Sequence, residues 1–597
     1  MATKEIGSLI RQLENDYQNA GETTLSKYVQ FDLRENLDKI DAYANSKHIS
    51  GPVDSMGRDK PFFNIGTSAV NVVYRATDID RRNILIKPTK LKDTTRAFIA
   101  TMKVQEWMRK SYFGTFLNKW GRTLAKYGSA VTKFVEKDGE LHAVVVNWHK
   151  VIIDPIDFYS NPVIEILEYT PAQLRKNKSY DQGMVASLIS AVQSRETADG
   201  QNKDNRAGYI RLYEIHGELS KSLLTEKEAD EDIYVQQMQV VSFVMGEKEN
   251  DFDDFVLVKG KEESPYLLHS LIEEDNRSTG IGAIEYLFES QWMENHSMKA
   301  IKDQLDLASK LIFQTADDTY VGQNALLAIE QGDILVHREN MPLTQINNGS
   351  HDITQFQNFG TSWKQLGNEI VGISEAMLGQ TPKSGTAWRQ TEAVLAESHD
   401  LFELMTENKG LGIEEMFRKY VLKFVRKQLS NRKEIMGVLT DSQIKQIDVS
   451  YINSETEKRI KKEVIDSLVK GELPVSMDVQ STQESIQEEL SKMGNTRSFI
   501  PSEDVTEKQW KEYFEDMEWD LEVDVTGEQT NTGTYLTTLT TVLQTIATNP
   551  LVLSDPNAKM IFSKILTMTG AVSPLELTGT QTPPPQTPEV TQPQVSA

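Results

Sequence analysis

One uninterrupted stretch of helical periodicity constrains the fold of this chain more than any other feature. Between Gly282 and Phe313 apolar residues recur every three or four positions, and neither a proline nor an internal glycine interrupts the pattern. The repeating positions are Ile284, Phe288, Trp292, Met298, Ile301, Leu305, Ala308 and Ile312. At 1.5 Å per residue, a helix of about 32 residues would reach about 48 Å, which is long for a globular domain. The pattern predicts a strut or a tunnel wall, with a buried core helix as the alternative.

Polar side chains interrupt the apolar face of this stretch. Gln291, Asn295 and His296 stand among the repeating apolar positions, and each would need hydrogen-bond partners in a dry core. The interruption favours a helix that packs against copies of itself over one that is fully buried.

The length and composition predict a modular protein without disulfides. A chain of 597 residues exceeds what one hydrophobic core usually organises, so several subdomains are expected. Hydrophobic residues make up 39% and charged residues 25%, and no apolar run approaches the roughly 20 residues that span a bilayer. The first residues lack the apolar core of a signal peptide, and the chain has no cysteine, which excludes disulfides and thiol chemistry.

The charge is strongly acidic. A formal net charge of −24 and a pI near 5.0 are opposite to the basic stripe of a protein that grips phosphates, so tight static DNA binding is not expected. An acidic surface is compatible with a protein past which DNA must slide, because like charges disfavour sticking. Charge alone identifies no function.

Periodicity along the rest of the chain predicts an α+β fold that is mainly α. Helical spacing occurs in residues 1–45, in 94–126 as one helix or two broken near Gly114, and in 386–429, where Gly410 and Gly412 predict a kink. Strand-like runs are 130–135, 141–146, 151–153, 209–216, 233–244 and 252–259. The last three runs, separated by charged turns, indicate a small sheet inserted between helical regions.

Two polar segments are expected to lack a packed core. Residues 195–207 have few apolar anchors and are predicted to form an exposed loop. Residues 578–597 are rich in Pro, Thr and Gln, which predicts extended or disordered chain.

Local motifs for phosphate, metal or nucleophilic chemistry are absent from the sequence. There is no G-x-x-x-x-G-K-[ST] string, no H-x-x-x-H and no G-x-S-x-G, and the run from Gly280 to Glu285 falls short of a dinucleotide fingerprint. Asp251, Asp253 and Asp254 lack the glycine and glutamate of a calcium loop. No cofactor, metal or catalytic residue is therefore predicted, although carboxylates from distant positions could still converge.

Several segments, in order along the chain, resemble one protein family. They are WGRTLAKYGSAVTKFVEKDGE with VVNWHKVIIDP, the strands of 205–265, STGIGAIEYLFESQWMENHSMKAIKDQLDLASKLIF, GDILVHRENMPLTQIN with WKQLGNEIVGISEAMLGQTPKSGTAWRQTEAV, and the run from VDVTGEQTNTGTY to TGAVSPLEL. Together they cover most of residues 60–577 and are similar to the portal proteins of tailed double-stranded DNA bacteriophages, the ring subunits of the head-to-tail connector.

The resemblance implies a portal fold with wing, stem, clip and crown. The expected parts begin with an N-terminal helical segment at 1–60, the first part of the wing with the first stem segment at 61–204, and the clip at 205–278. The stem helix follows at 279–313, and the second part of the wing, at 314–500, contains a tunnel loop at 379–386 and a long kinked helix. The crown is expected at 501–577 and a disordered tail at 578–597.

The resemblance also implies site residues and partners. The tunnel loop would face DNA through Gln380, Thr381, Pro382, Lys383, Ser384 and Gly385, and stem packing or the channel would involve Gln291, Asn295 and Lys299. The subunit would form a ring, a dodecamer in the family, at a unique capsid vertex of the virion after assembly in the host cytoplasm. Its partners would be double-stranded DNA passing nonspecifically, the terminase, the major capsid protein and tail or adaptor proteins, with no membrane.

Two alternatives stay open at this stage. Another virion structural protein, such as a tail adaptor or an internal scaffold, would share the acidity and the helices but would need no tunnel loop. An enzyme with a carboxylate site assembled from distant positions would show activity without a ring. Ring formation with an axial channel distinguishes the portal from both.

Overall fold

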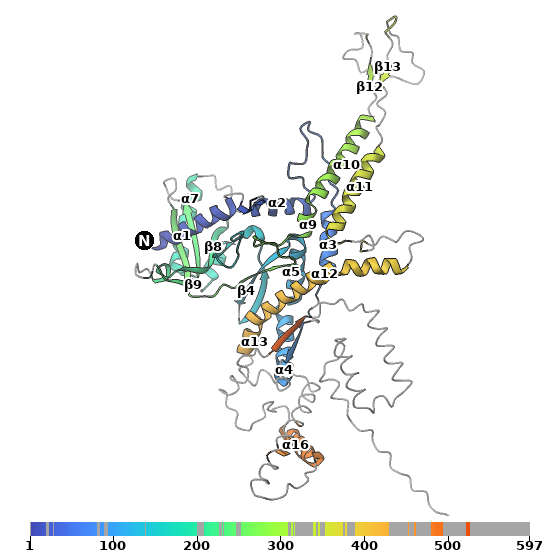
Figure 1. The fold of residues 1–597 in the computed structure, drawn as a ribbon. Helices are drawn as coiled ribbons and strands as arrows, with labels where there is room; N and C mark the ends of the chain where they lie inside the picture. The colour runs from blue at the N-terminus through green and yellow to red at the C-terminus, as the bar shows by residue number, and fades with distance from the viewer. Residues whose placement is uncertain are drawn as a thin grey trace, which may run out of the picture. The chain divides into compact units, whose positions relative to one another are not determined.

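The computed structural model shows a mixed α/β chain in which helices predominate. It describes residues 2–19, 23–27, 29–79, 81, 84–88, 94–137, 139–199, 208–225, 230, 232–245, 252–308, 312–314, 316, 338–341, 344–346, 353–373, 377–378, 388–428, 452, 456, 459–460, 462, 479–493 and 521–525. Of these residues 53% are helical and 22% lie in strands, which confirms the predicted mixture (Figure 1). No helix in these ranges is both long and apolar enough to cross a membrane.

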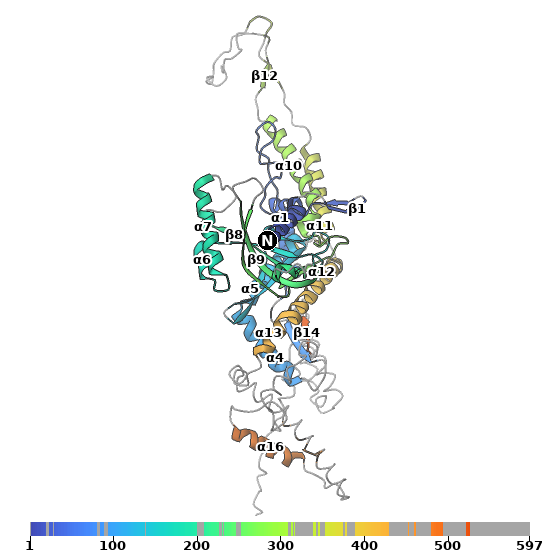
Figure 2. The same ribbon diagram turned by 90° about the vertical axis from the view of Figure 1, so that its left-hand side faces the viewer.

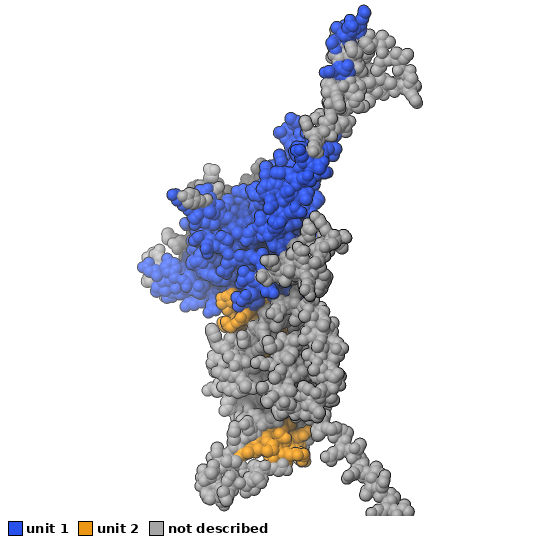
Figure 3. All heavy atoms as spheres, turned by 45° about the vertical axis from the view of Figure 1, so that its right-hand side comes forward, with its two compact units in different colours: residues 1–79, 114–412 blue, residues 80–113, 413–597 orange. Residues whose placement is uncertain are grey.

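The chain divides into two compact units. Unit 1 comprises residues 1–79 and 114–412, and unit 2 comprises residues 80–113 and 413–597 (Figure 3). Each unit therefore contains segments that are far apart in the sequence.

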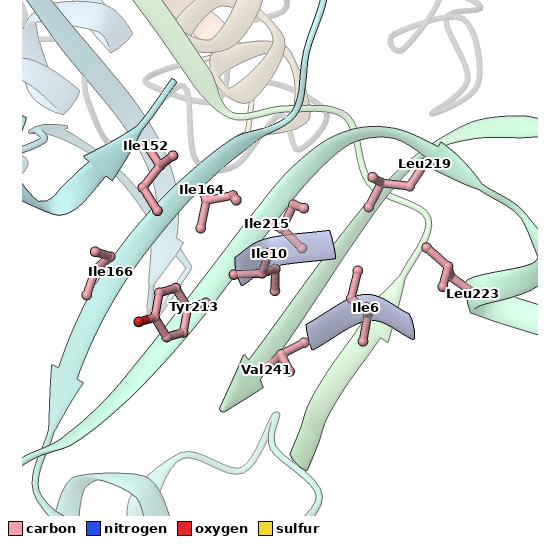
Figure 4. Packing of buried hydrophobic residues seen from close by; sticks show 10 residues of the cluster. All are labelled: Ile6, Ile10, Ile152, Ile164, Ile166, Tyr213, Ile215, Leu219, Leu223 and Val241. Carbon is pink, nitrogen blue, oxygen red and sulfur yellow. The ribbon is translucent and has the colours of Figure 1, made fainter. Parts of the chain in front are cut away.

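Unit 1 contains a five-stranded antiparallel sheet in the order β10-β9-β8-β7-β6. Alternate side chains of its central strand β8 point to opposite faces, as the two-residue period of a strand requires. Tyr213 and Ile215 share one cluster with Ile6 and Ile10 of α1 (Figure 4). The strands are β6 (Val151–Ile152), β7 (Val163–Tyr169), β8 (Ile210–Ser220), β9 (Tyr234–Met245) and β10 (Phe252–Gly260), and α1 spans Ala2–Glu14.

The other face of this sheet is covered by α6 (Pro171–Lys176) and α7 (Gln182–Asp199). Ile210 and Leu212 of β8 are buried there with Leu188 of α7. A capping box in which Thr170 and Gln173 bond reciprocally begins α6. The sheet is thus buried on both faces and forms the core of the β-rich part of unit 1.

A second, three-stranded sheet in unit 1 has the order β11-β4-β5. Strand β4 (Ser129–Lys137) pairs with β5 (Glu140–Val145) in the predicted hairpin and with β11 (Tyr266–Ser270) on its other edge. Helix α5 (Phe113–Tyr127) leads into β4 through Gly128, whose φ of +80° suits a glycine.

Helices make up the remainder of unit 1. They are α2 (Leu33–Ala44), α3 (Gly66–Ala76), α8 (Ser222–Thr225), α9 (Ala283–Tyr286), α10 (Phe288–Ala308), α11 (Ile353–Ile370) and most of α12 (Trp388–Met416). Short antiparallel pairs join β1 (Thr23–Ser26) to β2 (Val29–Phe31) and β12 (Ile312–Gln314) to β13 (Thr344–Ile346).

Unit 2 is built around α4 and an aromatic cluster. Trp107, Phe113 and Phe417 pack with ring centroids 5.0–6.1 Å apart, in tilted and edge-to-face geometry. The elements are β3 (Ile84–Pro88), which pairs with β14 (Leu521–Val525), α4 (Thr94–Lys110), a π-helix (Phe417–Val421), α13 (Leu422–Gln428) and α16 (Val479–Met493).

Several sequence predictions are confirmed. The helices near the N-terminus, the hairpin of β4 and β5, and the three strands β8, β9 and β10 form as expected. The predicted break near Gly114 is confirmed as the gap between α4 and α5, where Tyr112 adopts a φ of +54°.

Other predictions need correction. The inserted small sheet is not separate, because β8, β9 and β10 continue the sheet of β6 and β7 and share its core with α1. The predicted loop at 195–207 is helical as far as Asp199. Helix α12 continues through Gly410 and Gly412, where Gly412 admits the ring of His269 and leaves no space for a side chain. The kink predicted at these glycines stays a prediction.

The long helix from Gly282 to Phe313 is interrupted at both ends. Leu287 adopts ψ near 3° and separates α9 from α10, and α10 ends at Ala308. Beyond it, Ile312 and Phe313 pair with β13. The apolar periodicity therefore continues across both boundaries, and only the second is followed by pairing with a distant strand.

Candidate functional site

Helices α10 and α11 form an antiparallel pair that extends from the rest of unit 1 (Figures 1 and 2). The chain leaves α10 through β12 and returns through β13 before α11 begins. In register, Ile312 lies opposite Ile346 and Gln314 lies opposite Thr344. Paired strands thus connect the two helices at the end of the pair that is remote from α9.

Two glycines bring α10 and α11 into close contact. A Cβ atom added at Gly367 would lie 2.9 Å from Cβ of Ser290, and one added at Gly360 would lie 3.3 Å from Cβ of Ser297. Gly360 and Gly367 are seven residues apart in α11, as are Ser290 and Ser297 in α10, so the two contacts lie on one face of each helix. Together with Leu287 and Glu294, the two serines leave no room for a side chain at either glycine, and the helix pair is therefore tightly packed.

The predicted stem residues Gln291 and Asn295 are buried inside the subunit. Oε1 of Gln291 accepts hydrogen bonds from the backbone N–H groups of Ile65 and Gly66 at 3.0 and 3.3 Å, and its Nε2 donates to the carbonyl of Phe63 at 2.5 Å. Oδ1 of Asn295 accepts from the N–H of Phe63 at 2.9 Å. The side chains of Gln291 and Asn295 thus hold residues 63–66, the segment that leads into α3, against α10.

The role predicted for these two residues, in stem packing or the channel, stays a prediction. Their exposed fractions are 1% and 5%, so both side chains are buried within one subunit. The polar interruption of the apolar stripe is real, but its partners lie about 225 residues earlier in the same chain.

Lys299 belongs to a small charged group with Asp54 and Arg58, which lie in the loop between α2 and α3, and with Asp303 of α10. Its Nζ lies 3.0 Å from Asp54 and 2.6 Å from Asp303, and Arg58 also pairs with Asp54 at 2.8 Å. The backbone N–H of Arg58, together with the bonds from Lys299, holds the pKa of Asp54 well below its usual range. Lys299 is therefore engaged within the subunit too.

A cavity of about 430 Å³ opens beside α10, between that helix and the loop that follows α2. The indole of Trp292 stacks on His296 with centroids 5.5 Å apart, and Trp292 is 53% exposed. Aromatic, imidazole and lysine side chains line the cavity: Tyr43, His48, Ile49, Ser50, Lys60, Trp292, Asn295, His296 and Lys299.

Helix α11 presents an apolar stripe to solvent. Phe359, Leu366 and Ile370 are 47%, 49% and 55% exposed, and Trp363 contacts Phe359 edge-to-face at 6.3 Å. At 100° per residue these four positions fall within an arc of about 60°. Only Lys364 and Glu369 are charged among the 18 residues of α11, although a quarter of the chain is charged.

A second constellation, which the sequence did not reveal, joins the two sheets of unit 1. Nζ of Lys133 on β4 lies 2.7 Å from Glu165 on β7 and 2.8 Å from Glu214 on β8. His216 bonds Glu214 at 2.7 Å, and the hydroxyl of Tyr266 donates to Glu165 at 2.8 Å. Burial opposes ionisation of Glu214, but His216 and Lys133 outweigh it and lower its pKa to about 2. The cluster is an ionic clasp between sheets.

One pattern could have indicated this clasp. Glu214 and His216 occupy the same face of β8 as Ile210 and Leu212, at positions where the strand period requires core residues. Charged groups at such positions need buried partners. Their partner Lys133 is 81 residues from Glu214, so periodicity could not have named it.

The predicted tunnel loop, Gln380, Thr381, Pro382, Lys383, Ser384 and Gly385, lies outside the described residues, as do the tail and all of the crown except β14. Within the described part of the chain, no group of three or more His, Asp or Glu side chains is arranged to hold a metal ion. No known family model matches the sequence, and no curated protein matches it.

Removing the Gln291 amide tests the docking of the loop on α10. In a Gln291→Leu variant the N–H groups of Ile65 and Gly66 and the carbonyl of Phe63 lose their partner, and each buried unsatisfied group costs about 1–3 kcal/mol. We expect a lower melting temperature and faster proteolysis between residues 48 and 63. The control Gln357→Leu, at an exposed position of α11, should change neither. Equal behaviour of the two variants would contradict the docking role.

Proposed function

We propose that this chain is a portal subunit that assembles into a closed ring with an axial channel for DNA. The observation that carries the proposal is the pair of α10 and α11: two closely packed helices, with a strand pair at their far end, that expose an apolar and nearly uncharged face. Such a face is typical of the core of a protein interface, where charged residues are depleted. The ordered resemblance of the sequence segments to portals supports the same reading.

In this proposal α10 and α11 form the stem. Of the strands within residues 205–278, first assigned to the clip, β8, β9 and β10 belong to the five-stranded sheet of unit 1 and β11 belongs to its three-stranded sheet. The connection between α10 and α11, which contains β12 and β13, is the better candidate for the clip, because it lies at the free end of the helix pair.

The role of the ring is passage of DNA. The acidic net charge of −24 disfavours a static grip on phosphates, and contact with DNA would be nonspecific, through the small polar groups of residues 380–385 and the amine of Lys383. ATP hydrolysis would come from the terminase that docks on the ring during packaging. Tail or adaptor proteins would follow at the clip, and the major capsid protein would surround the ring at one vertex of the virion.

Negative-stain electron microscopy of the purified full-length protein tests this function. We expect closed rings with a central hole in top views, with twelve subunits as the resemblance implies. A heterologous head-to-tail contact is the kind that closes such rings. Uniform monomers or open filaments at high protein concentration, across several salt concentrations, would overturn the proposal and favour an adaptor or scaffold.

A further inference from the structure

We propose that the apolar stripe of α11, formed by Phe359, Trp363, Leu366 and Ile370, docks into the Trp292 cavity beside α10 of a second copy of this chain. This inference rests on the proposed ring, and it names the two surfaces that meet at each subunit boundary. The argument combines the chemistry of the stripe, the chemistry of the cavity and the directions in which they face.

No described part of its own chain covers the stripe. Phe359, Leu366 and Ile370 are about half exposed, while the glycines of the same helix face α10. A fully buried aromatic side chain removes about 150–250 Å² from water, and because these residues are already about half buried, the stripe would supply about 300 Å² more. That is a large share of the roughly 800 Å² per partner in a specific interface.

The cavity offers matching chemistry. Trp292 and His296 present stacked rings, and Ile49 at the rim is 53% exposed. Lys60 and Lys299 line the same cavity, and ammonium groups are attracted to the faces of aromatic rings. Aromatic rings that enter such a cavity would find apolar contact with Trp292 and Ile49 and the ammonium group of Lys60, while Lys299 keeps its ion pairs with Asp54 and Asp303. A volume of about 430 Å³ lies within the range of cavities that accept a bound group.

The two surfaces face different directions, which allows the contact to repeat. Ser290 is the α10 residue that faces Gly367 of α11. At 100° per residue, Trp292 and His296 lie about 200° and 240° from Ser290 around the axis of α10. The cavity is therefore on the side of α10 that is remote from α11 and from its stripe. A contact between two different surfaces of one chain is heterologous, and it leaves one stripe and one cavity free after each addition.

Charge also indicates where a second copy can approach. Each chain carries a net charge of −24, so a neighbour must approach through a surface with little charge of its own. Helix α11 has one lysine and one glutamate in 18 residues, whereas α10 has six charged residues among its 21. The stripe is thus the part of the pair on which like-charge repulsion is weakest.

Cysteine cross-linking tests the contact in the full-length protein. The chain contains no cysteine, so introduced thiols report only the designed positions. We would combine Ile49→Cys at the cavity rim with Leu366→Cys on the stripe, and treat the protein with a short bismaleimide. We expect a ladder of covalent oligomers on a denaturing gel. The matched control, Ile49→Cys with Gln357→Cys on another face of α11, should give little cross-linking.

A second pair of variants measures the dependence of assembly on the stripe. Phe359→Glu with Leu366→Glu should yield folded subunits, with unchanged circular dichroism, that no longer form rings. Thr361→Glu with Gln365→Glu adds the same charge to exposed positions on another face of α11 and should still form rings.

The outcomes separate this inference from the proposed function. Rings together with the ladder and the loss of rings in the stripe variant support the contact. Rings without a ladder, and with no effect of the stripe variant, overturn the contact and leave the portal proposal standing. Cross-linking of Leu366→Cys alone would show stripe packed on stripe and would also overturn it. A protein that stays monomeric throughout would overturn both.

Discussion

Replacing Gly128 with alanine should lower the free energy of unfolding of unit 1 by about 2–5 kcal/mol. Gly128 joins α5 to β4 with a φ of +80°, a conformation that costs a residue with a Cβ about 1–2 kcal/mol. The added Cβ would also lie 2.6 Å from the Gly280 oxygen and the Gly282 nitrogen. Both are backbone atoms that cannot rotate away, so the chain must shift, and overpacking of this kind adds about 1–3 kcal/mol or more.

Gly139→Ala is the matched control for this substitution. Gly139 has the same φ of +80°, in the turn between β4 and β5, but nothing lies within 4 Å of its added Cβ. We expect a loss of about 1–2 kcal/mol, from the backbone conformation alone. Urea and thermal unfolding followed by circular dichroism would measure both variants. Equal losses would show that the crowding at Gly128 is relieved by movement of the 280–282 segment.

The second large effect is expected at the ionic clasp. Lys133→Met leaves Glu165 and Glu214 without their shared cation between the two sheets. Removing one partner of a buried ion pair typically destabilises a protein by about 3–5 kcal/mol, because the remaining charge is uncompensated. Lys150→Met is the control: Lys150 pairs with Glu168 at 3.0 Å in a more exposed position, where an ion pair contributes about 0–1 kcal/mol.

The clasp also predicts a pH dependence. The folded pKa of Glu214, about 2, lies below its ordinary value, so the stabilisation it contributes is present above about pH 4.5 and is lost as the pH falls toward 2. Lys133→Met removes a main cause of the lowered pKa. The difference in stability between wild type and variant should therefore shrink between pH 5 and pH 2. A constant difference over this interval would contradict the assignment.

Features of the fold that depend on neighbouring residues could be predicted, while those that depend on distant residues could not. The break between α4 and α5 and the hairpin of β4 and β5 follow from local spacing and a turn at Gly139. The end of α10 could not, because Ile312 continues the apolar period of the helix and leaves it only by pairing with Ile346. The strand pair of β1 and β2 was also missed, since seven residues of mixed polarity carry no clear period.

The candidate site shows the same division. The sequence correctly singled out Gln291 and Asn295 as unusual, because polar groups on an apolar face need partners. It could not show that those partners are backbone groups of residues 63–66. The apolar stripe on α11 could be predicted from the spacing of its residues, but its exposure to solvent could not. The exposure follows only from the contacts of Gly360 with Ser297 and of Gly367 with Ser290, which show which face of α11 packs on α10.

In the proposed ring, the scarcity of charge on α11 determines how assembly should respond to solution conditions. Repulsion between subunits of net charge −24 is screened at moderate ionic strength, with a Debye length of about 8 Å near 0.15 M, whereas burial of Phe359 and Leu366 is not weakened by salt. Added salt should therefore promote association through this helix, unlike an interface of ion pairs. Because burial of apolar surface strengthens on warming from low temperature, cold, dilute buffer is the condition in which the subunits should come apart.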